Sequence, residues 1–243
     1  MKIDILAVGV HPDDVELSCS GTLLRHIAMG KTVGLLDLTR GELGTRGTAE
    51  IRDREAAEAA RLMGAQFRKN LGMADGFFEV NRDHLLPILQ VLREHQPDIV
   101  LANALKDRHA DHGRAAKLVA DACFYSGLAK IETLGDNGLP QEPWRPRALY
   151  HYIQDHNLVP DFVVDIAPFI EKKMELVLAF RSQFYLPQDT EFSDEPQTPI
   201  SGRDFFEFLK AKARTYGREA GLEFAEGFNV ARTPGVQDLF SLI

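Results

Sequence analysis

The stretch "IDILAVGVHPDDVELSCSGTLLRHIAMG" (residues 3–30) decides the fold. Its first part, residues 3–10, is a short apolar run of the kind that forms a buried strand. From Val15 onward apolar residues recur at helical spacing, and Gly30 closes the segment, as glycine commonly does at the end of a helix. A buried strand that leads directly into a helix begins a βαβ unit, so this stretch predicts a parallel sheet.

The same alternation of short apolar runs and longer amphipathic segments continues along the chain. Further strands are predicted at residues 32–39, 98–104, 148–153 and 161–166, and helices at 15–30, 49–64, 84–95, 113–127, 171–184 and 202–221. The polar, proline-containing stretch 186–201 predicts a long surface loop. Because no repeat or linker divides the sequence, residues 1–243 are expected to form a single α/β domain around a mostly parallel sheet.

The composition narrows the classes of partner. Of 243 residues, 44% are hydrophobic and 26% are charged, and the formal net charge is −8. Such an acidic chain is a poor candidate for binding nucleic acid or an anionic membrane. Its two cysteines, Cys19 and Cys123, lie in apolar helical patterns and predict reduced, buried thiols. The apolar N-terminus is too short for a membrane span and lacks a signal-peptide cleavage pattern, so we expect a cytoplasmic protein.

Polar clusters follow two of the predicted strands. His11 to Asp14 follow the strand at 3–10, and Asp107 to His112 follow the strand at 98–104. Ligands of parallel α/β sheets bind beyond the carboxyl ends of the strands, so we expect both clusters at the same edge. Capping of helices or surface charge would explain either cluster alone. Three histidines and four acids at matching positions favour a shared site.

The residue types in these clusters predict a metal centre. Two histidines and an aspartate form a three-ligand zinc site with an open position for water, which is the catalytic arrangement. His11 and Asp14 are three residues apart and share a face of a first helical turn, and His112 opens the next helix. We expect one zinc ion per chain, although histidine and aspartate ligands also suit other divalent metals.

The remaining ionisable residues predict acid and base roles. Asp13 is next to a metal ligand, and zinc lowers the pKa of bound water toward roughly 7, so a carboxylate there suffices as a general base. His109 with Asp111 forms a second candidate pair. A histidine held by a carboxylate stays cationic more readily, and it could protonate a leaving amine or stabilise an oxyanion.

A glycine-rich segment lies between the two clusters. In residues 40–48 three glycines alternate with Glu42 and Arg46, and Arg52 follows in the next predicted helix. One interpretation is a flexible loop that leads into that helix. The other is a loop that closes over a polar substrate, with the arginines holding an anionic group. The chain contains no G-x-G-x-x-G, P-loop or G-x-S-x-G pattern, so it offers no sign of dinucleotide binding, a P-loop or a serine hydrolase.

The motifs "HPDD" (11–14) and "DRHADH" (107–112) together resemble those of the LmbE-like (PIG-L) family of zinc-dependent N-acetylglucosaminyl deacetylases. Ala110 stands where that family usually has proline. The stretches "DLTRGELGTRGTAEIR", "NLGMADGFF", "YHYIQ", "SQFY", "EPQTPIS" and "AEGF" are similar to the branch that deacetylates N-acetylglucosaminyl malate in bacillithiol biosynthesis. The resemblance therefore implies a hydrolase that releases acetate from a small glycoside.

The resemblance also implies a fold and a set of roles. The fold is a Rossmann-like three-layer α/β sandwich with its site at the C-terminal ends of the strands, and members often form hexamers or other homo-oligomers. Matching positions imply His11, Asp14 and His112 as zinc ligands, Asp13 as base, His109 with Asp111 as the acid or electrophilic pair, and Arg52 as a substrate contact. Two alternatives remain: a deacetylase or amidase for another N-acetylglucosaminide or thiol conjugate, and a non-catalytic sugar-binding module.

Overall fold

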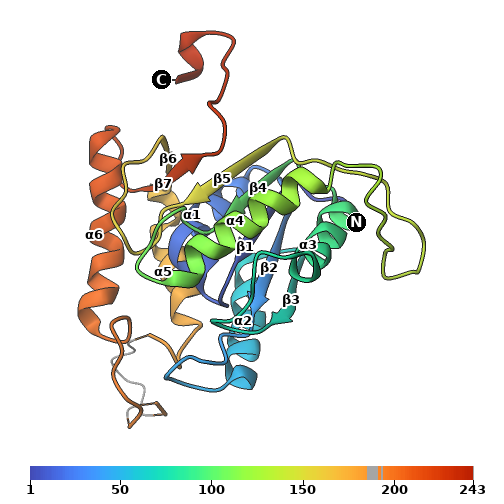
Figure 1. The fold of residues 1–243 in the computed structure, drawn as a ribbon. Helices are drawn as coiled ribbons and strands as arrows, with labels where there is room; N and C mark the ends of the chain where they lie inside the picture. The colour runs from blue at the N-terminus through green and yellow to red at the C-terminus, as the bar shows by residue number, and fades with distance from the viewer. Residues whose placement is uncertain (185–190, 193, 243) are drawn as a thin grey trace.

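The computed structural model describes residues 1–184, 191–192 and 194–242, and these form one seven-stranded sheet covered by helices (Figure 1). The strands are β1 (Ile5–Gly9), β2 (Val33–Thr39), β3 (Phe67–Met73), β4 (Ile99–Ala102), β5 (Ala148–Tyr152), β6 (Phe162–Asp165) and β7 (Ala225–Val230). The helices are α1 (Asp14–Ala28), α2 (Ala49–Met63), α3 (Arg82–His95), α4 (Ala110–Tyr125), α5 (Ile170–Leu178) and α6 (Arg203–Glu219), with 3₁₀ turns η1 (Ala167–Phe169) and η2 (Leu239–Leu242).

The sheet has the order β3-β2-β1-β4-β5-β7-β6. Neighbouring strands from β3 to β5 run parallel, whereas β7 runs antiparallel to both β5 and β6. The predicted mostly parallel α/β sheet is therefore confirmed, with an antiparallel addition at one edge.

Helices cover both faces of the sheet because successive side chains of a strand point to opposite sides. Leu6 and Val8 of β1 pack in a core that includes residues of α3 and α4. Ile5 and Ala7 pack in a second core with residues of α1, α2 and α5. Both faces of β1 are therefore buried, which explains its unbroken apolar sequence. The result is the three-layer sandwich that the family resemblance implied.

Local signals set the ends of the helices. Thr48 begins α2, since its side chain accepts a hydrogen bond from the Ile51 amide at 3.3 Å. Gly64 ends the same helix with a φ of 83°, a conformation that favours glycine. The helix predicted at 171–184 is shorter than expected, because α5 ends at Leu178.

Two strands, β3 and β7, were not predicted. Each interrupts its apolar residues with charged ones, and those charges are paired in the folded chain. Arg68 of β3 contacts Asp37 at 2.6 Å, and Glu226 of β7 contacts Lys173 at 2.7 Å. In the predicted loop 186–201, residues 186–190 and 193 lie outside the described residues, and the described remainder contains no helix or strand.

The topology brings the two polar clusters together. β1 and β4 are hydrogen-bonded neighbours, with Ala7 opposite Leu101 near their carboxyl ends. The segments that follow these strands therefore leave the sheet side by side. Among the described residues, no helix has the length and apolar character needed to cross a membrane.

Candidate metal centre

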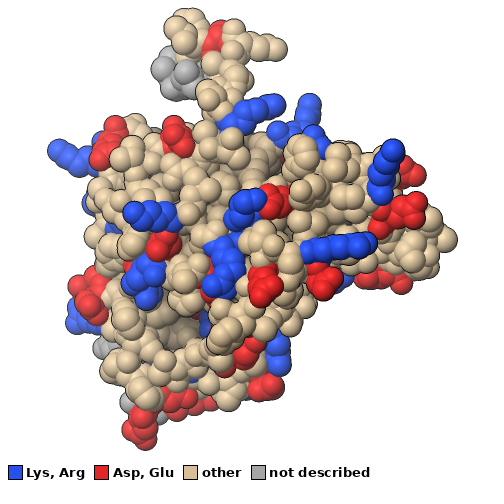
Figure 2. All heavy atoms as spheres, viewed as in Figure 1, with Lys and Arg blue, Asp and Glu red and all other residues tan. Residues whose placement is uncertain are grey.

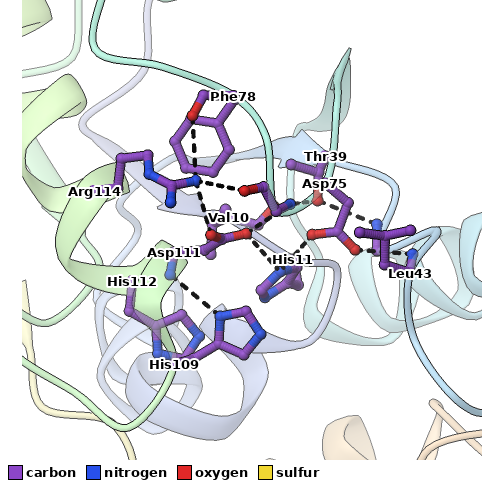
Figure 3. A network of polar contacts seen from close by, with 12 residues as sticks. Val10, His11, Thr39, Leu43, Asp75, Phe78, His109, Asp111, His112 and Arg114 are labelled. Carbon is purple, nitrogen blue, oxygen red and sulfur yellow. Dashed lines mark hydrogen bonds and ion pairs between the residues drawn. The ribbon is translucent and has the colours of Figure 1, made fainter.

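Three histidines meet beyond the ends of β1 and β4 (Figure 3). The ring of His11 lies 4.8 Å from that of His109 and 5.7 Å from that of His112, and the latter two are stacked at 5.2 Å. His11 follows β1, while His109 and His112 lie at the start of α4. The structure thus brings together the histidines of the two predicted clusters.

Asp14 joins the two ends of this cluster. Its Oδ1 lies 3.3 Å from Nε2 of His112, and its Oδ2 lies 3.8 Å from Nδ1 of His11. Four donors fix the carboxylate at 2.9 Å, namely the amides of Val10 and His11 and the side chains of Asn103 and Gln154. The three predicted ligands therefore lie together, and the carboxylate is held in place by hydrogen bonds.

Carboxylates also orient the two histidines. Nδ1 of His112 meets Asp107 at 2.5 Å, which leaves Nε2 directed toward Asp14. Nε2 of His11 meets Asp75 at 3.0 Å, and Asp75 is in turn held by the Leu43 amide at 3.0 Å (Figure 3). Metal-binding histidines commonly have such a carboxylate on the other ring nitrogen. Asp75 was not predicted as a site residue, and Asp107 was part of a predicted cluster without an assigned role.

The donor set fits a divalent metal such as zinc. One ligand atom from each of His11, His109 and His112 lies within 4.8 Å of the others, and the same holds for His11, Asp75 and Asp111. Imidazole nitrogens and carboxylate oxygens are ligands that zinc accepts. The first of these groups contains His109, whereas the predicted ligand set contains Asp14 in its place. Metal analysis of variants must therefore show which of the two residues is the third ligand.

Asp13 has a buried carboxylate and an unusual backbone. Its φ is 130°, and it is 4% exposed. A non-glycine residue in such a conformation costs about 1–3 kcal/mol, which the surrounding contacts must offset. Asp13 precedes α1, but its side chain makes no capping hydrogen bond. It pairs instead with Nη2 of Arg52 at 2.8 Å, so the capping interpretation is wrong for this side chain.

The two adjacent aspartates have opposite acidities. Burial raises the pKa of Asp13 to about 7, although the Arg52 guanidinium opposes this shift. Burial also acts to raise the pKa of Asp14, but His112 and His11 outweigh it and hold that pKa well below its usual range. Asp14 is therefore the firmly ionised carboxylate, as a metal ligand should be.

The histidines respond to the surrounding carboxylates. Burial lowers the pKa of His11, but Asp111 and Asp75 outweigh burial and raise it to about 10. Burial likewise lowers the pKa of His112, but Asp14 and Asp107 raise it to about 9. The carboxylates thus create a buried environment that favours positive charge, whether on the imidazoles or on a bound cation.

His109 and Asp111 do not form the predicted side-chain pair. The Asp111 carboxylate accepts hydrogen bonds from the Gly76 amide at 2.9 Å and from Arg114 at 3.0 Å (Figure 3). Nδ1 of His109 accepts from the main-chain amide of Asp111 at 3.3 Å, so a neutral ring carries its proton on Nε2. Burial, with His11 and His112 nearby, lowers the pKa of His109. The structure therefore lacks the expected hydrogen bond between the His109 ring and the Asp111 carboxylate, and the direction of the pKa shift favours the uncharged ring.

The predicted substrate-binding residues contact the protein itself. Arg52 donates to the Pro12 carbonyl at 2.8 Å and to the Gly41 carbonyl at 3.2 Å, in addition to Asp13. Arg46 donates to the carbonyl oxygens of Ser182, Phe192, Glu195 and Pro196. Glu42 accepts from the Asp75 amide at 2.8 Å. These contacts tie residues 40–48 to the rest of the molecule, and they use the guanidinium groups that were expected to bind substrate.

A cavity of about 310 Å³ opens over the histidine cluster. Its lining includes His11, Asp13 and His112 together with residues of β7 and α6. Sites for small molecules commonly have volumes of roughly 300–1,000 Å³. The α6 residues Phe208, Lys212 and Tyr216 were missed as site residues, because in sequence their segment reads only as an amphipathic helix.

Comparison with known proteins places this geometry in a family. The model of the PIG-L family, described as GlcNAc-PI de-N-acetylase, matches residues 6–123. The structure of the conserved protein TT1542 from Thermus thermophilus has 39% identity over 97% of both chains, with a TM-score of 0.83. Diacetylchitobiose deacetylase of Thermococcus kodakarensis has 27% identity over 96% of this chain and 84% of its own. The 4-oxalmesaconate hydratase of Pseudomonas putida has 26% identity over 74% of each chain. The chain belongs to the PIG-L, or LmbE-like, family.

Proposed function

We propose that this chain is a zinc-dependent deacetylase that removes the acetyl group from the sugar of N-acetyl-α-D-glucosaminyl L-malate, a step of bacillithiol biosynthesis. The observation that carries the proposal is the joining of His11, Asp14 and His112 beneath one cavity, with the buried Asp13 carboxylate beside them. The similarity to a diacetylchitobiose deacetylase supports the acetylated amino sugar as the reacting part.

His11, Asp14 and His112 would hold the zinc ion, one per chain. When bound, such an ion polarises a carbonyl oxygen and lowers the pKa of water. The carboxylates of Asp75 and Asp107 fix the orientations of the two imidazoles.

The residues of the chain supply the proton transfers. Asp13 accepts a proton from the water that attacks the acetyl carbon, and Arg52 holds the carboxylate in position for this step. His109 donates a hydrogen bond from Nε2 to the developing oxyanion. The carbon–nitrogen bond then breaks, Asp13 returns the proton to the leaving nitrogen, and acetate and a free amine result.

Acetate release from a panel of substrates tests the proposal. We expect turnover of N-acetylglucosaminyl malate, lower turnover of diacetylchitobiose and free N-acetylglucosamine, and loss of all activity with a chelator. Preference for another glycoside or thiol conjugate would change the substrate within the same reaction. Binding of the sugar without acetate release, in zinc-supplied protein, would indicate the sugar-binding module.

A relative with a different reaction supplies the necessary control. Since the 4-oxalmesaconate hydratase is also similar to this chain, family membership does not fix the reaction. Hydration of 4-oxalmesaconate without release of acetate from any substrate would assign the chain to the hydratase chemistry. We also propose that the protein is cytoplasmic and that it forms a homo-oligomer, with a hexamer as one expected form. Light scattering of the purified chain measures the oligomeric state.

A further inference from the structure

Lys212 places a buried ammonium group in the wall of the cavity. It lies on α6, and its Nζ is shielded from solvent and has no hydrogen-bond partner among the described residues. Its nearest ring contacts are the faces of Phe208 at 5.8 Å and Tyr216 at 5.9 Å. A cation in such surroundings is stabilised only weakly.

The other cationic side chains of the cavity differ from Lys212 in this respect. Among the described lysines and arginines that line it, each of the others pairs with a carboxylate: Arg52 with Asp13, Arg108 with Asp155, and Lys173 with Glu226. Lys212 is thus the cation of this wall that is free to pair with a bound molecule.

The energetics favour an anionic partner. Burial lowers the pKa of Lys212 to about 8, although Asp107 and Asp155 act in the opposite direction. Burying an unpaired charge is unfavourable, and a hydrogen bond between two charged groups offsets that cost. An anion inside the cavity would therefore gain both a charge partner and a donor that the protein does not use.

We infer that Lys212 binds a carboxylate or phosphate on the aglycone of the substrate, so that the enzyme selects anionic N-acetylglucosaminides. This inference rests on the proposed deacetylase function. It replaces the arginines 46 and 52 in the expected anion-binding role, because both are engaged elsewhere. The metal centre lies on the segments after β1 and β4, and Lys212 lies on α6 beside β7 (Figure 1). One cavity can thus hold the acetamide at the histidines and the anion at the lysine.

Kinetics with three substrates test the inference, using Lys212→Met and the matched control Lys210→Met. Lys210 lies on the same helix, but its Nζ pairs with the exposed Glu171 at 2.7 Å. For N-acetylglucosaminyl malate or N-acetylglucosamine 1-phosphate, Lys212→Met should raise KM about 10- to 100-fold, the loss expected for one charged hydrogen bond. KM for the neutral methyl N-acetylglucosaminide should stay within about twofold, as should all values for Lys210→Met. The anion with the larger effect identifies carboxylate or phosphate as the natural group.

Two further measurements separate a binding role from a structural one. Lys212→Met should keep or raise the Tm of the free protein, because methionine suits a buried wall better than an unpaired ammonium. Calorimetry with the deacetylated products, which need no turnover, should show weaker binding of glucosaminyl malate but unchanged binding of methyl glucosaminide.

The outcomes distinguish this inference from the proposed function. Turnover of all substrates with KM values unaffected by Lys212→Met would overturn the role of Lys212 and leave the deacetylase intact. Equal losses on anionic and neutral substrates would also overturn it. If the wild-type chain released no acetate, the proposed function would fail. Calorimetry would then test the role of Lys212 independently of turnover. Equal binding of glucosaminyl malate by the wild-type protein and Lys212→Met would exclude Lys212 as the anion-binding residue.

Discussion

Asp13 combines a strained backbone with a buried carboxylate. Its φ of 130° turns the chain between β1 and α1, and Arg52 holds both its side chain and the preceding Pro12 carbonyl. Strain of this kind persists where the surrounding contacts fix it, and it is common at functional sites. The strained backbone at Asp13 therefore lowers the stability of the fold but holds the carboxylate in the position that the proposed reaction needs.

Asp13→Asn should separate the base from the metal centre. The amide keeps the shape of the side chain but cannot accept the proton, so we expect kcat to fall about 10²- to 10⁴-fold. Zinc content, measured on the purified variant, should remain at one ion per chain. Near-normal turnover would remove Asp13 from the role of base.

Metal analysis of four alanine variants should identify the ligands. Substitution of His11, Asp14 or His112 should lose bound zinc, whereas His109→Ala should keep zinc and lower kcat, since His109 is assigned to the oxyanion. Loss of zinc in His109→Ala, with zinc kept in Asp14→Ala, would assign His109 as the third ligand in place of Asp14.

Arg52→Met should show whether this arginine acts through Asp13 or on the substrate. Its hydrogen bonds to Asp13, Pro12 and Gly41 predict a positioning role. We therefore expect kcat to fall about 10²-fold, as for a misplaced catalytic group, with little change in KM. A rise in KM for the malate glycoside at unchanged kcat would restore the substrate-clamping interpretation.

The sequence predicted those site residues that lie in recognisable motifs. His11, Asp14 and His112 could be grouped because matching strand ends meet at one edge of a parallel sheet. Asp75 and Lys212 could not, because nothing local marks them. Their roles depend on which atoms they face across the fold. The same is true of Arg46 and Arg52, whose guanidinium groups pair with other parts of the chain.

At the scale of elements, α1 depends on side chains from outside it. Lys173 of α5 donates to the carbonyl oxygens of Glu16 and Leu17, at 3.2 and 2.7 Å. Glu226 of β7 accepts from the amides of Gly21 and Thr22, at 3.0 and 2.7 Å. This buried pair therefore ties together three elements that flank the cavity.

Lys173→Met should lower the free energy of unfolding by about 3–5 kcal/mol, because it leaves Glu226 as an uncompensated buried charge. The double variant Lys173→Met/Glu226→Gln should be less destabilised than the sum of the single variants, as expected for residues in contact. Urea denaturation measures both. Lys172→Met is the control, since Lys172 is an exposed neighbour paired with Glu175, and its effect should stay within about 0.5 kcal/mol.

The same ion pairs explain which elements could be predicted. β1 is apolar throughout, and β2 is apolar apart from Asp37 and Thr39, so their runs of apolar residues identified them. β3 and β7 carry arginine and glutamate at positions that a pattern of hydrophobicity assigns to loops. Only the partner residues, which are between about 30 and 50 positions away in sequence, make these charges compatible with a strand.

At the scale of the whole molecule, the negative charge that favours a cation is confined to the metal centre. On the face drawn in Figure 2, acidic and basic side chains are interspersed over the surface. The carboxylates that raise the pKa values of His11 and His112 are clustered around those rings instead. Attraction for a cation thus arises in the site rather than from a surface field of one sign.

Removal of zinc should lower the stability of the whole chain. A ligand that binds only the folded state at 100 times its Kd stabilises that state by about 2.7 kcal/mol, so chelator treatment should lower Tm and added zinc should restore it. His11→Ala should show a Tm that is insensitive to zinc. An equal response of the wild-type protein and this variant would locate the stabilising metal elsewhere.

The two sides of the cavity come from different parts of the chain. His11 to His112 lie within the part that the family model matches, whereas α6 and the wall around Lys212 lie beyond residue 123. Substitutions in α6 could therefore change which substrate binds without changing the residues that cleave the amide bond. For directed evolution, a library confined to the inward positions of α6 should exchange one glycoside preference for another while every surviving variant keeps its metal.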